Sequence, residues 1–188
     1  MQPTEARSVD ELVSLVESGG RPKFVFFWGH TPRRKGSIDQ SCFSNWFPSR
    51  FSVDGVSYPT TEHYMMAEKA RLFGDARVRD RILQAGSPGA AKRLGREVAG
   101  FDESTWIANR FRIVVSGNLA KFSQHRELGA YLTQTGERVL VEASPRDRIW
   151  GIGLSKDESH AENPRLWKGL NLLGFALMEV RFRLKQES

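Results

Sequence analysis

The sequence predicts an α+β fold: a single, mostly helical domain around a small β-sheet. Two runs rich in β-branched and aromatic residues, at residues 23–29 and 138–144, have the length of buried strands rather than helices. Helix caps and apolar periodicity mark longer segments over much of the remaining chain. Hydrophobic residues make up 39% of the 188 residues, which suffices to bury a core.

Several of the predicted helices have a start signal of their own. Ser8 and Glu11 form a capping box. Ser87 precedes a proline at the first position of a short helix, and Asp102 can cap a long one. The predicted helices cover residues 8–20, 61–73, 76–84, 87–95, 103–125, 126–136 and 165–185.

A hairpin and two loops complete the expected layout. Asp54 and Gly55 separate two β-prone pieces and suit a type I′ turn. Residues 29–40 and 157–164 are polar and are expected to be loops. Because no repeat or linker interrupts the chain, we predict an N-terminal helical extension over residues 1–22 and one domain over residues 23–188.

The charge of the chain points to an anionic partner. The net charge is +6 and the isoelectric point is near 9.8. A nucleic acid and a phosphorylated small molecule both fit, because the basic residues are scattered and the only notable cluster is short, at residues 33–35.

Cysteine and histidine usage makes a cytoplasmic protein without a metal site the expected case. The one cysteine, Cys42, excludes an internal disulfide and suits a reducing compartment. The N-terminus lacks the pattern of a signal peptide, and no run is long and apolar enough to span a membrane. The four histidines have no metal-type spacing, and "GIGLSK" lacks the third glycine of a dinucleotide loop.

The stretch "GVSYPTTEHYMMAEKARLF", residues 55–73, allows two interpretations. A cap at Thr60 or Thr61 places Glu62 in the first helical turn, and Lys69 lies seven residues on, along one stripe. Glu62 can simply stabilise the positive end of the helix dipole. Alternatively, Glu62 faces a pocket while Lys69 holds a phosphate, and a ligand compensates two charges that have apolar neighbours.

Other polar and aromatic residues are candidates on position alone. Glu142 ends the second predicted strand, and Asp147 lies in the loop after it, where functional side chains are common. Asp147 could equally form a surface ion pair with the flanking arginines. Trp106, at the start of the long helix, could belong to the core or could stack on a heterocyclic base.

Six pieces of sequence resemble the NADAR family, in the family's order. They are "CFSNWF", "YPTTEHYMMAEKA", "GAAKRLGR", "LAKFSQHREL", "LTQTGERVLVEASPRDRIWGIGL" and "LWKGLNLLGFALMEVR". The resemblance runs from Phe24 to Arg181, so residues 23–188 look like a NADAR catalytic domain. The family includes YbiA-like N-glycosidases that hydrolyse phosphoribosylamino-pyrimidine intermediates of riboflavin biosynthesis. It also includes enzymes that remove ADP-ribose from guanine in nucleic acid.

The resemblance implies roles for particular residues. Glu62 in T-x-E-H-Y, Asp147 before W-G-x-G and Trp106 match functional positions and are the expected catalytic residues. The expected substrate-binding residues are Asn45, Lys69, Lys92, Lys121 and Trp150, with the lysines suited to phosphate. No metal and no cofactor are implied. Glu142 is expected to be a supporting residue.

The sequence departs from the family pattern at Met66, where many members have glutamine, at Trp46, and at residues 28–30 after the first strand. These changes touch expected pocket walls and leave the substrate open. Three functions therefore remain: hydrolysis of a phosphoribosylated pyrimidine, hydrolysis of ADP-ribosylated guanine, and nucleotide binding without catalysis. The carboxylates argue against the last, because a pure phosphate binder gains nothing from placing them beside the anion.

Overall fold

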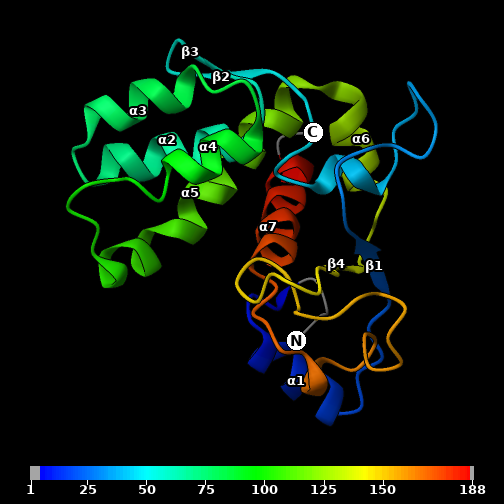
Figure 1. The fold of residues 1–188 in the computed structure, drawn as a ribbon. Helices are drawn as coiled ribbons and strands as arrows, with labels where there is room; N and C mark the ends of the chain where they lie inside the picture. The colour runs from blue at the N-terminus through cyan, green and yellow to red at the C-terminus, as the bar shows by residue number, and fades with distance from the viewer. Residues whose placement is uncertain (1–4, 187–188) are drawn as a thin grey trace. The chain divides into compact units, whose positions relative to one another are not determined.

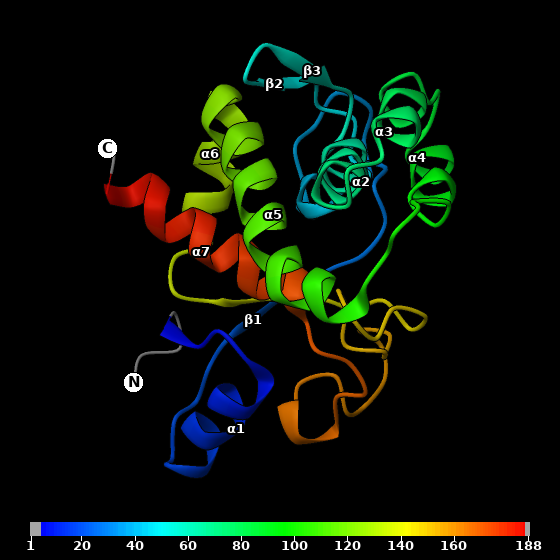
Figure 2. The same ribbon diagram turned by 90° about the vertical axis from the view of Figure 1, so that its left-hand side faces the viewer.

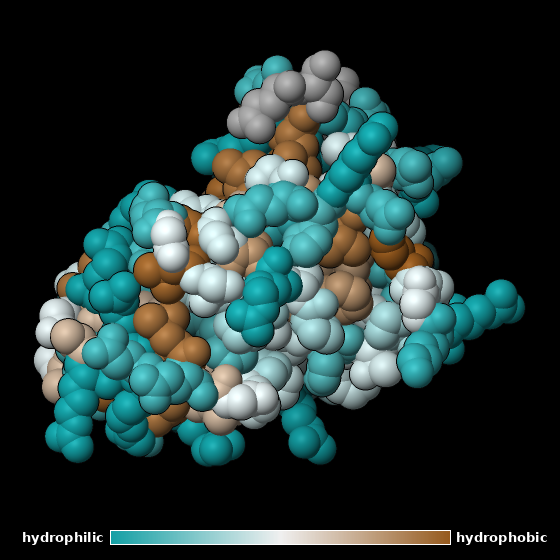
Figure 3. All heavy atoms as spheres, turned by 90° about the horizontal axis from the view of Figure 1, so that it is seen from above, coloured by the Kyte–Doolittle hydropathy of each residue, from teal (hydrophilic) through white to brown (hydrophobic). Residues whose placement is uncertain are grey.

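The structure confirms the α+β class with helix in excess. It is a computed structural model that describes residues 5–186, so residues 1–4 and 187–188, the outer ends of the two predicted domain ranges, lie outside it. The chain forms two compact units: a first unit that runs up to Ser44 and resumes at Arg126, and a second unit, Asn45–His125. Polar side chains cover most of the face shown in Figure 3, with apolar ones in small groups among them.

The first unit contains the two predicted buried strands, which pair in parallel (Figure 1). Phe27 at the end of one strand lies opposite Glu142 at the end of the other. Helix α7 packs on β4 so closely that a Cβ at Gly174 would collide with the carbonyl of Leu140. The elements of this unit are α1 (Val9–Glu17), β1 (Phe24–Phe27), η2 (Gln40–Phe43), α6 (Arg126–Thr133), β4 (Val139–Glu142), η3 (Pro164–Leu166) and α7 (Leu172–Gln186).

The last helix begins later than the predicted residue 165. Only a short 3₁₀ turn forms at η3, and α7 starts at Leu172. The side chain of Asn171 explains the delay: its Oδ1 accepts from the N–H of Glu142 at 3.0 Å, and its Nδ2 donates to the carbonyl of Leu140 at 2.9 Å. These bonds fix Asn171 on the strand with a φ of 51°, a left-handed conformation that interrupts a helix.

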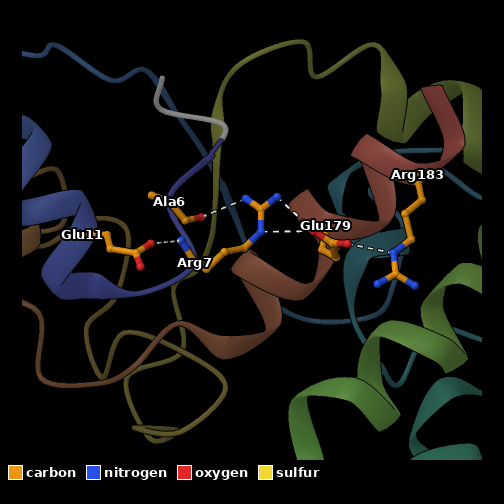
Figure 4. A network of polar contacts seen from close by, with 5 residues as sticks. All are labelled: Ala6, Arg7, Glu11, Glu179 and Arg183. Atoms are coloured by element: carbon orange, nitrogen blue, oxygen red, sulfur yellow. Dashed lines mark hydrogen bonds and ion pairs between the residues drawn. The ribbon is translucent and has the colours of Figure 1, made fainter. Parts of the chain in front are cut away.

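The N-terminal segment is tied to the first unit by charge as well as by packing. Figure 4 shows the guanidinium of Arg7 between the carbonyl of Ala6 and the carboxylate of Glu179 on α7. Arg183 donates to the other oxygen of Glu179 at 2.8 Å. Ser8 caps α1 as predicted, but Glu11 accepts from the N–H of Arg7 at 2.7 Å, one residue before the cap.

The second unit consists of a hairpin and four helices. Figure 2 looks nearly along α2, with α5 on one side and α3 and α4 on the other. The hairpin turn has the predicted type I′ geometry, since Asp54 and Gly55 both have positive φ, 50° and 78°. Helices α4 and α5 carry the predicted caps, Ser87 and Asp102. The elements of the second unit are β2 (Phe51–Val53), β3 (Val56–Tyr58), α2 (Thr61–Leu72), α3 (Ala76–Leu83), α4 (Pro88–Leu94) and α5 (Glu103–Gln124).

Helices α2 and α5 approach each other closely at a glycine. A Cβ added to Gly117 would overlap the ring of Tyr64 and lie 3.2 Å from the methyl group of Thr61. Both neighbours are buried and belong to the first turn of α2. The absence of a side chain at Gly117 therefore sets the distance between the two longest helices of this unit.

Gly117→Ala is expected to lower the free energy of unfolding by about 1–3 kcal/mol, because the added methyl group must displace a buried ring. Chemical denaturation measures the change. Gly89→Ala is the matched control, since a Cβ there would make an ordinary 3.5 Å contact with Trp46. Equal effects of the two substitutions would contradict the close approach.

Candidate active site

The first turn of α2 buries a carboxylate. Thr60 caps the helix, accepting from the N–H of His63, and the N–H of Glu62 donates to the carbonyl of Asn45 at 2.9 Å. The side chain of Glu62 is only 3% exposed. The first helical turn lies near the positive end of the helix dipole, which attracts negative charge.

His63, beside Glu62, locks the same turn. Its Nε2 lies 3.0 Å from the carbonyl of Ala85 and its Nδ1 lies 2.8 Å from the hydroxyl of Thr60. Because a carbonyl only accepts, Nε2 carries the proton, and Nδ1 of the neutral ring accepts from the Thr60 hydroxyl. Burial lowers the pKa of His63. We conclude that His63 is a structural part of the turn and holds the neutral form.

A polar group inside the second unit surrounds the start of α2. The Oδ1 of Asn45, a predicted binding residue, accepts from Nδ2 of Asn118 on α5 at 3.1 Å. Lys121 follows one turn later on α5 and is fully buried, with its ammonium 5.4 Å from the ring centre of Phe47 and 4.9 Å from that of Phe122. The segment that begins at Asn45 thus contacts both Glu62 and the helix that carries Lys121.

The other end of α2 carries a lysine among aromatic rings. The ammonium of Lys69 donates to the carbonyl of Gly95 at 2.8 Å and lies 4.2 Å from the ring centre of Phe101 and 5.7 Å from that of Trp106. These distances are within the range of cation–π attraction. Burial lowers the pKa of Lys69. Two predicted site residues, Lys69 and Trp106, are therefore brought together.

These contacts show that α2 and α5 run antiparallel. The start of α2 meets α5 near Gly117, and Lys69 meets it near Trp106. Glu62 and Lys69 lie seven residues apart, which is about 10 Å along a helix. One stripe of α2 thus bears a buried carboxylate at one end and an ammonium beside an indole at the other. Lys92, also predicted, is half-buried in the last turn of α4.

Asp147 and Trp150 lie in the first unit and contact each other. The Oδ1 of Asp147 accepts from the N–H groups of Ile149 and Trp150, at 2.9 and 2.8 Å. Ser144 accepts from the N–H of Asp147 at 3.2 Å. Asp147 therefore holds its loop through backbone groups, and the ion pairs recorded in the described part of the chain do not include Asp147 with Arg146 or Arg148.

Glu142, an expected supporting residue, is held at the end of β4 through its backbone. Its N–H donates to Asn171, and its carbonyl accepts from the N–H of Ile152 at 2.9 Å. Sequence reasoning missed Asn118 and Phe101, which contact Asn45 and Lys69. Asn118 could have been found as an amide in a helix rich in apolar residues, one turn before Lys121. A buried amide needs a hydrogen-bond partner, so its presence there indicates a polar contact inside the protein.

Across residues 5–186, no three His, Cys, Asp or Glu side chains gather in a way that could hold a metal ion. In the same span, no helix has the length and apolarity to cross a membrane.

Comparison with known proteins identifies relatives over most of the chain. Residues 26–185 match the NADAR domain family. The chain is 41% identical over 164 residues to N-glycosidase R617 of Acanthamoeba polyphaga mimivirus, covering 85% of this chain and 95% of that protein. It is 36% identical over 151 residues to N-glycosidase YbiA of Escherichia coli, covering 80% and 86%. The NMR structure of E. coli YbiA matches with a TM-score of 0.68 and 32% identity, covering 89% of this chain and 88% of that one.

The buried His63 generates a pH prediction. The unfolded chain takes up a proton near the ordinary pKa of about 6.5, whereas the folded chain does so only at lower pH. His63 thus gives its full stability above pH 6.5, and the free energy of unfolding falls below that, by up to about 1.4 kcal/mol per pH unit, until the folded pKa is reached.

Urea denaturation at pH 7.5 and 5.5 measures this slope. His63→Gln is expected to be less stable at pH 7.5 but to lose less stability on going to pH 5.5. His160→Gln, which removes an exposed histidine, is the matched control and should follow the wild type. A His63→Gln slope equal to that of the wild type would exclude His63 as the source.

Proposed function

This chain belongs to the NADAR family, whose members compared above include N-glycosidases, and on that premise we propose that it hydrolyses the C1′–N bond of a phosphoribosylamino-pyrimidine intermediate of riboflavin biosynthesis. Such enzymes are hydrolases of N-glycosyl compounds. The products are ribose 5-phosphate and the free amino-pyrimidine. The one cysteine, Cys42, is buried and forms no disulfide, which suits the cytoplasm, where we place the reaction.

The observation that carries the proposal is the buried carboxylate of Glu62. A charge at 3% exposure in a protein interior has a high desolvation cost and needs compensation by its surroundings or by a ligand. Cleavage of a glycosidic C–N bond builds positive charge on the ribose ring. A fixed anion stabilises that charge more in the transition state than in the ground state, which is the condition for catalysis.

The proposed reaction needs one water and one transferred proton. Water adds to C1′ as the C1′–N bond breaks, and the bonding electrons leave with the nitrogen. A carboxylate accepts a proton from the water, and that proton then passes to the leaving nitrogen, so that neutral amine departs and the carboxylate is restored. Glu62 and Asp147 are the two proposed carboxylates. Either could activate the water; in Asp147 the Oδ1 is occupied by backbone N–H groups, so Oδ2 is the oxygen left for this role.

The remaining proposed residues bind the substrate. Trp106 offers a half-buried indole for the heterocycle, and Lys69 beside it offers an ammonium for the phosphate, exchanging the carbonyl of Gly95 for the ligand. Lys92 and Lys121 are further proposed phosphate contacts, and Asn45 and Trp150 complete the proposed set. Binding energy from a phosphate, remote from the reacting carbon, can position that carbon.

A second candidate function is hydrolysis of ADP-ribosylated guanine in nucleic acid or nucleotides. The observation that favours it is the exposed cluster Arg33–Lys35, together with the net charge of +6. A strand of nucleic acid gains affinity from each phosphate that a cation neutralises. Both candidates cleave a C1′–N bond and share the same proposed carboxylates.

Glu62→Gln is expected to lower kcat about a hundredfold or more while substrate binding is kept, because the amide preserves shape but cannot take a proton or stabilise a cation. Asp147→Asn should act in the same direction. Glu68→Gln is the matched control on the same helix, since Glu68 is engaged with Arg71 instead. Turnover by Glu62→Gln at the wild-type rate would remove Glu62 from the mechanism.

A product assay separates the candidate substrates. The purified protein is offered a phosphoribosylamino-pyrimidine and ADP-ribosylated guanosine in parallel, with mass spectrometry of the products. We expect ribose 5-phosphate from the first. ADP-ribose from the second alone would establish the other candidate, and tight binding of either without product would leave a binding module.

A further inference from the structure

The first unit contains a cavity that the proposed reaction does not use. It measures about 350 Å³ and lies at the carboxyl ends of the parallel strands, where Phe27 of β1 and Ala143 after β4 both line it. The carboxyl edge of a parallel sheet is where nucleotides bind in open α/β sheets. The residues proposed above for catalysis and for binding the phosphoribosyl substrate do not line this cavity, although Arg33, from the cluster that favours the second candidate, does.

The loop that forms one wall is fixed in place. Asp39 caps η2, with Oδ1 accepting from the N–H of Ser41 at 2.9 Å, and its Oδ2 reaches back to accept from the N–H of Arg33 at 2.8 Å. Burial alone would raise the pKa of Asp39, but these hydrogen bonds and Arg33 lower it overall, so the carboxylate is charged at neutral pH. The long connection after β1 is thus held at its middle, and Arg33 is held at the cavity.

Another part of the lining comes from the segment after the "GIGL" motif. Ser155, Lys156 and Asp157 line the cavity there. The N–H of Ser155 donates to Glu158 at 2.8 Å, which closes a tight turn. The "GIGLSK" stretch lacks the glycine pattern of a dinucleotide loop, but it places Lys156, and Asp157 after it, at the carboxyl edge of the sheet.

Trp28 is the third feature of the cavity. It directly follows β1, lines the cavity and has 64% of its surface exposed, the largest fraction among the exposed large hydrophobic residues of the described chain. A planar indole at the mouth of a cavity, with cations beside it, is the arrangement by which proteins stack a nucleic-acid base without reading its sequence.

We propose that this cavity is a second nucleotide site: an aromatic base stacks on Trp28, and its phosphate binds between Arg33 and Lys156. Asp157 is the acceptor for the ribose hydroxyls. Asp39 takes no part in binding, since both its oxygens hold backbone N–H groups. The same chemistry is offered by a free ribonucleotide and by one nucleotide of a single strand, and the experiment distinguishes the two sources.

The site is tested by binding rather than by turnover, so its failure and failure of the hydrolase proposal are separate results. AMP and adenosine are titrated into the full chain by calorimetry, and a labelled single-stranded oligoadenylate by fluorescence anisotropy. Trp28→Ala is expected to weaken every one of these ligands about tenfold or more, and Trp28→Phe to restore most of the affinity. Arg33→Ala should weaken AMP severalfold and leave adenosine unchanged, since adenosine has no phosphate.

Two exposed residues of the same unit provide matched controls. Phe182→Ala removes an aromatic side chain that is 51% exposed, and Arg126→Ala removes one positive charge at the start of α6. Both should bind all three ligands as the wild type does. Affinity for the strand well above that for AMP, falling steeply with salt, would identify nucleic acid as the source; equal affinities would identify the free nucleotide. Absence of binding, or losses from the controls equal to those at Trp28 and Arg33, would overturn the site.

Discussion

Burial of the first turn of α2 is the constraint on which the second unit depends. The N–H groups of a helix start need acceptors, and here Thr60 and the carbonyl of Asn45 supply two of them inside the protein. Gly117 lets α5 come close enough to cover the turn. The same turn carries Glu62 and His63, so the packing that stabilises the helix start also fixes the proposed catalytic carboxylate.

The two ends of α2 differ in their electrostatics. At the start, Glu62 and the nearby Lys121 are both almost without exposure, which is costly for charged groups and is tolerated where hydrogen bonds or opposite charge compensate. At the other end, Lys69 is only half-buried and is held by a carbonyl and two aromatic rings. A phosphate could replace these partners, because its negative charge makes a stronger hydrogen bond with the ammonium than the neutral carbonyl does. This difference supports the proposal that Glu62 takes part in the chemistry and that Lys69 binds a phosphate.

The local features of the fold could be predicted from the sequence, whereas contacts distant in sequence could not. Caps at Ser8 and Thr60 and the Asp54-Gly55 turn depend on neighbours within a few residues, and the structure has them. The hydrogen bond of Asn118 to Asn45 joins residues 73 positions apart. The late start of α7 likewise depends on hydrogen bonds from Asn171 to strand residues 29 and 31 positions earlier. Helical periodicity in the sequence cannot reveal such bonds.

The candidate site shows the same division. Residue type and the family resemblance selected Glu62, Trp106 and Lys69, and the contact between Lys69 and Trp106 is consistent with a shared role. The resemblance marked residues 28–30 only as a departure from the family pattern near an expected pocket wall, and the 64% exposure of Trp28 beside a cavity could not be predicted, because an aromatic residue after a strand is usually core. Exposure and lining are three-dimensional properties of Trp28, so only the structure could show that it lines a cavity that Arg33 and Lys156 also line.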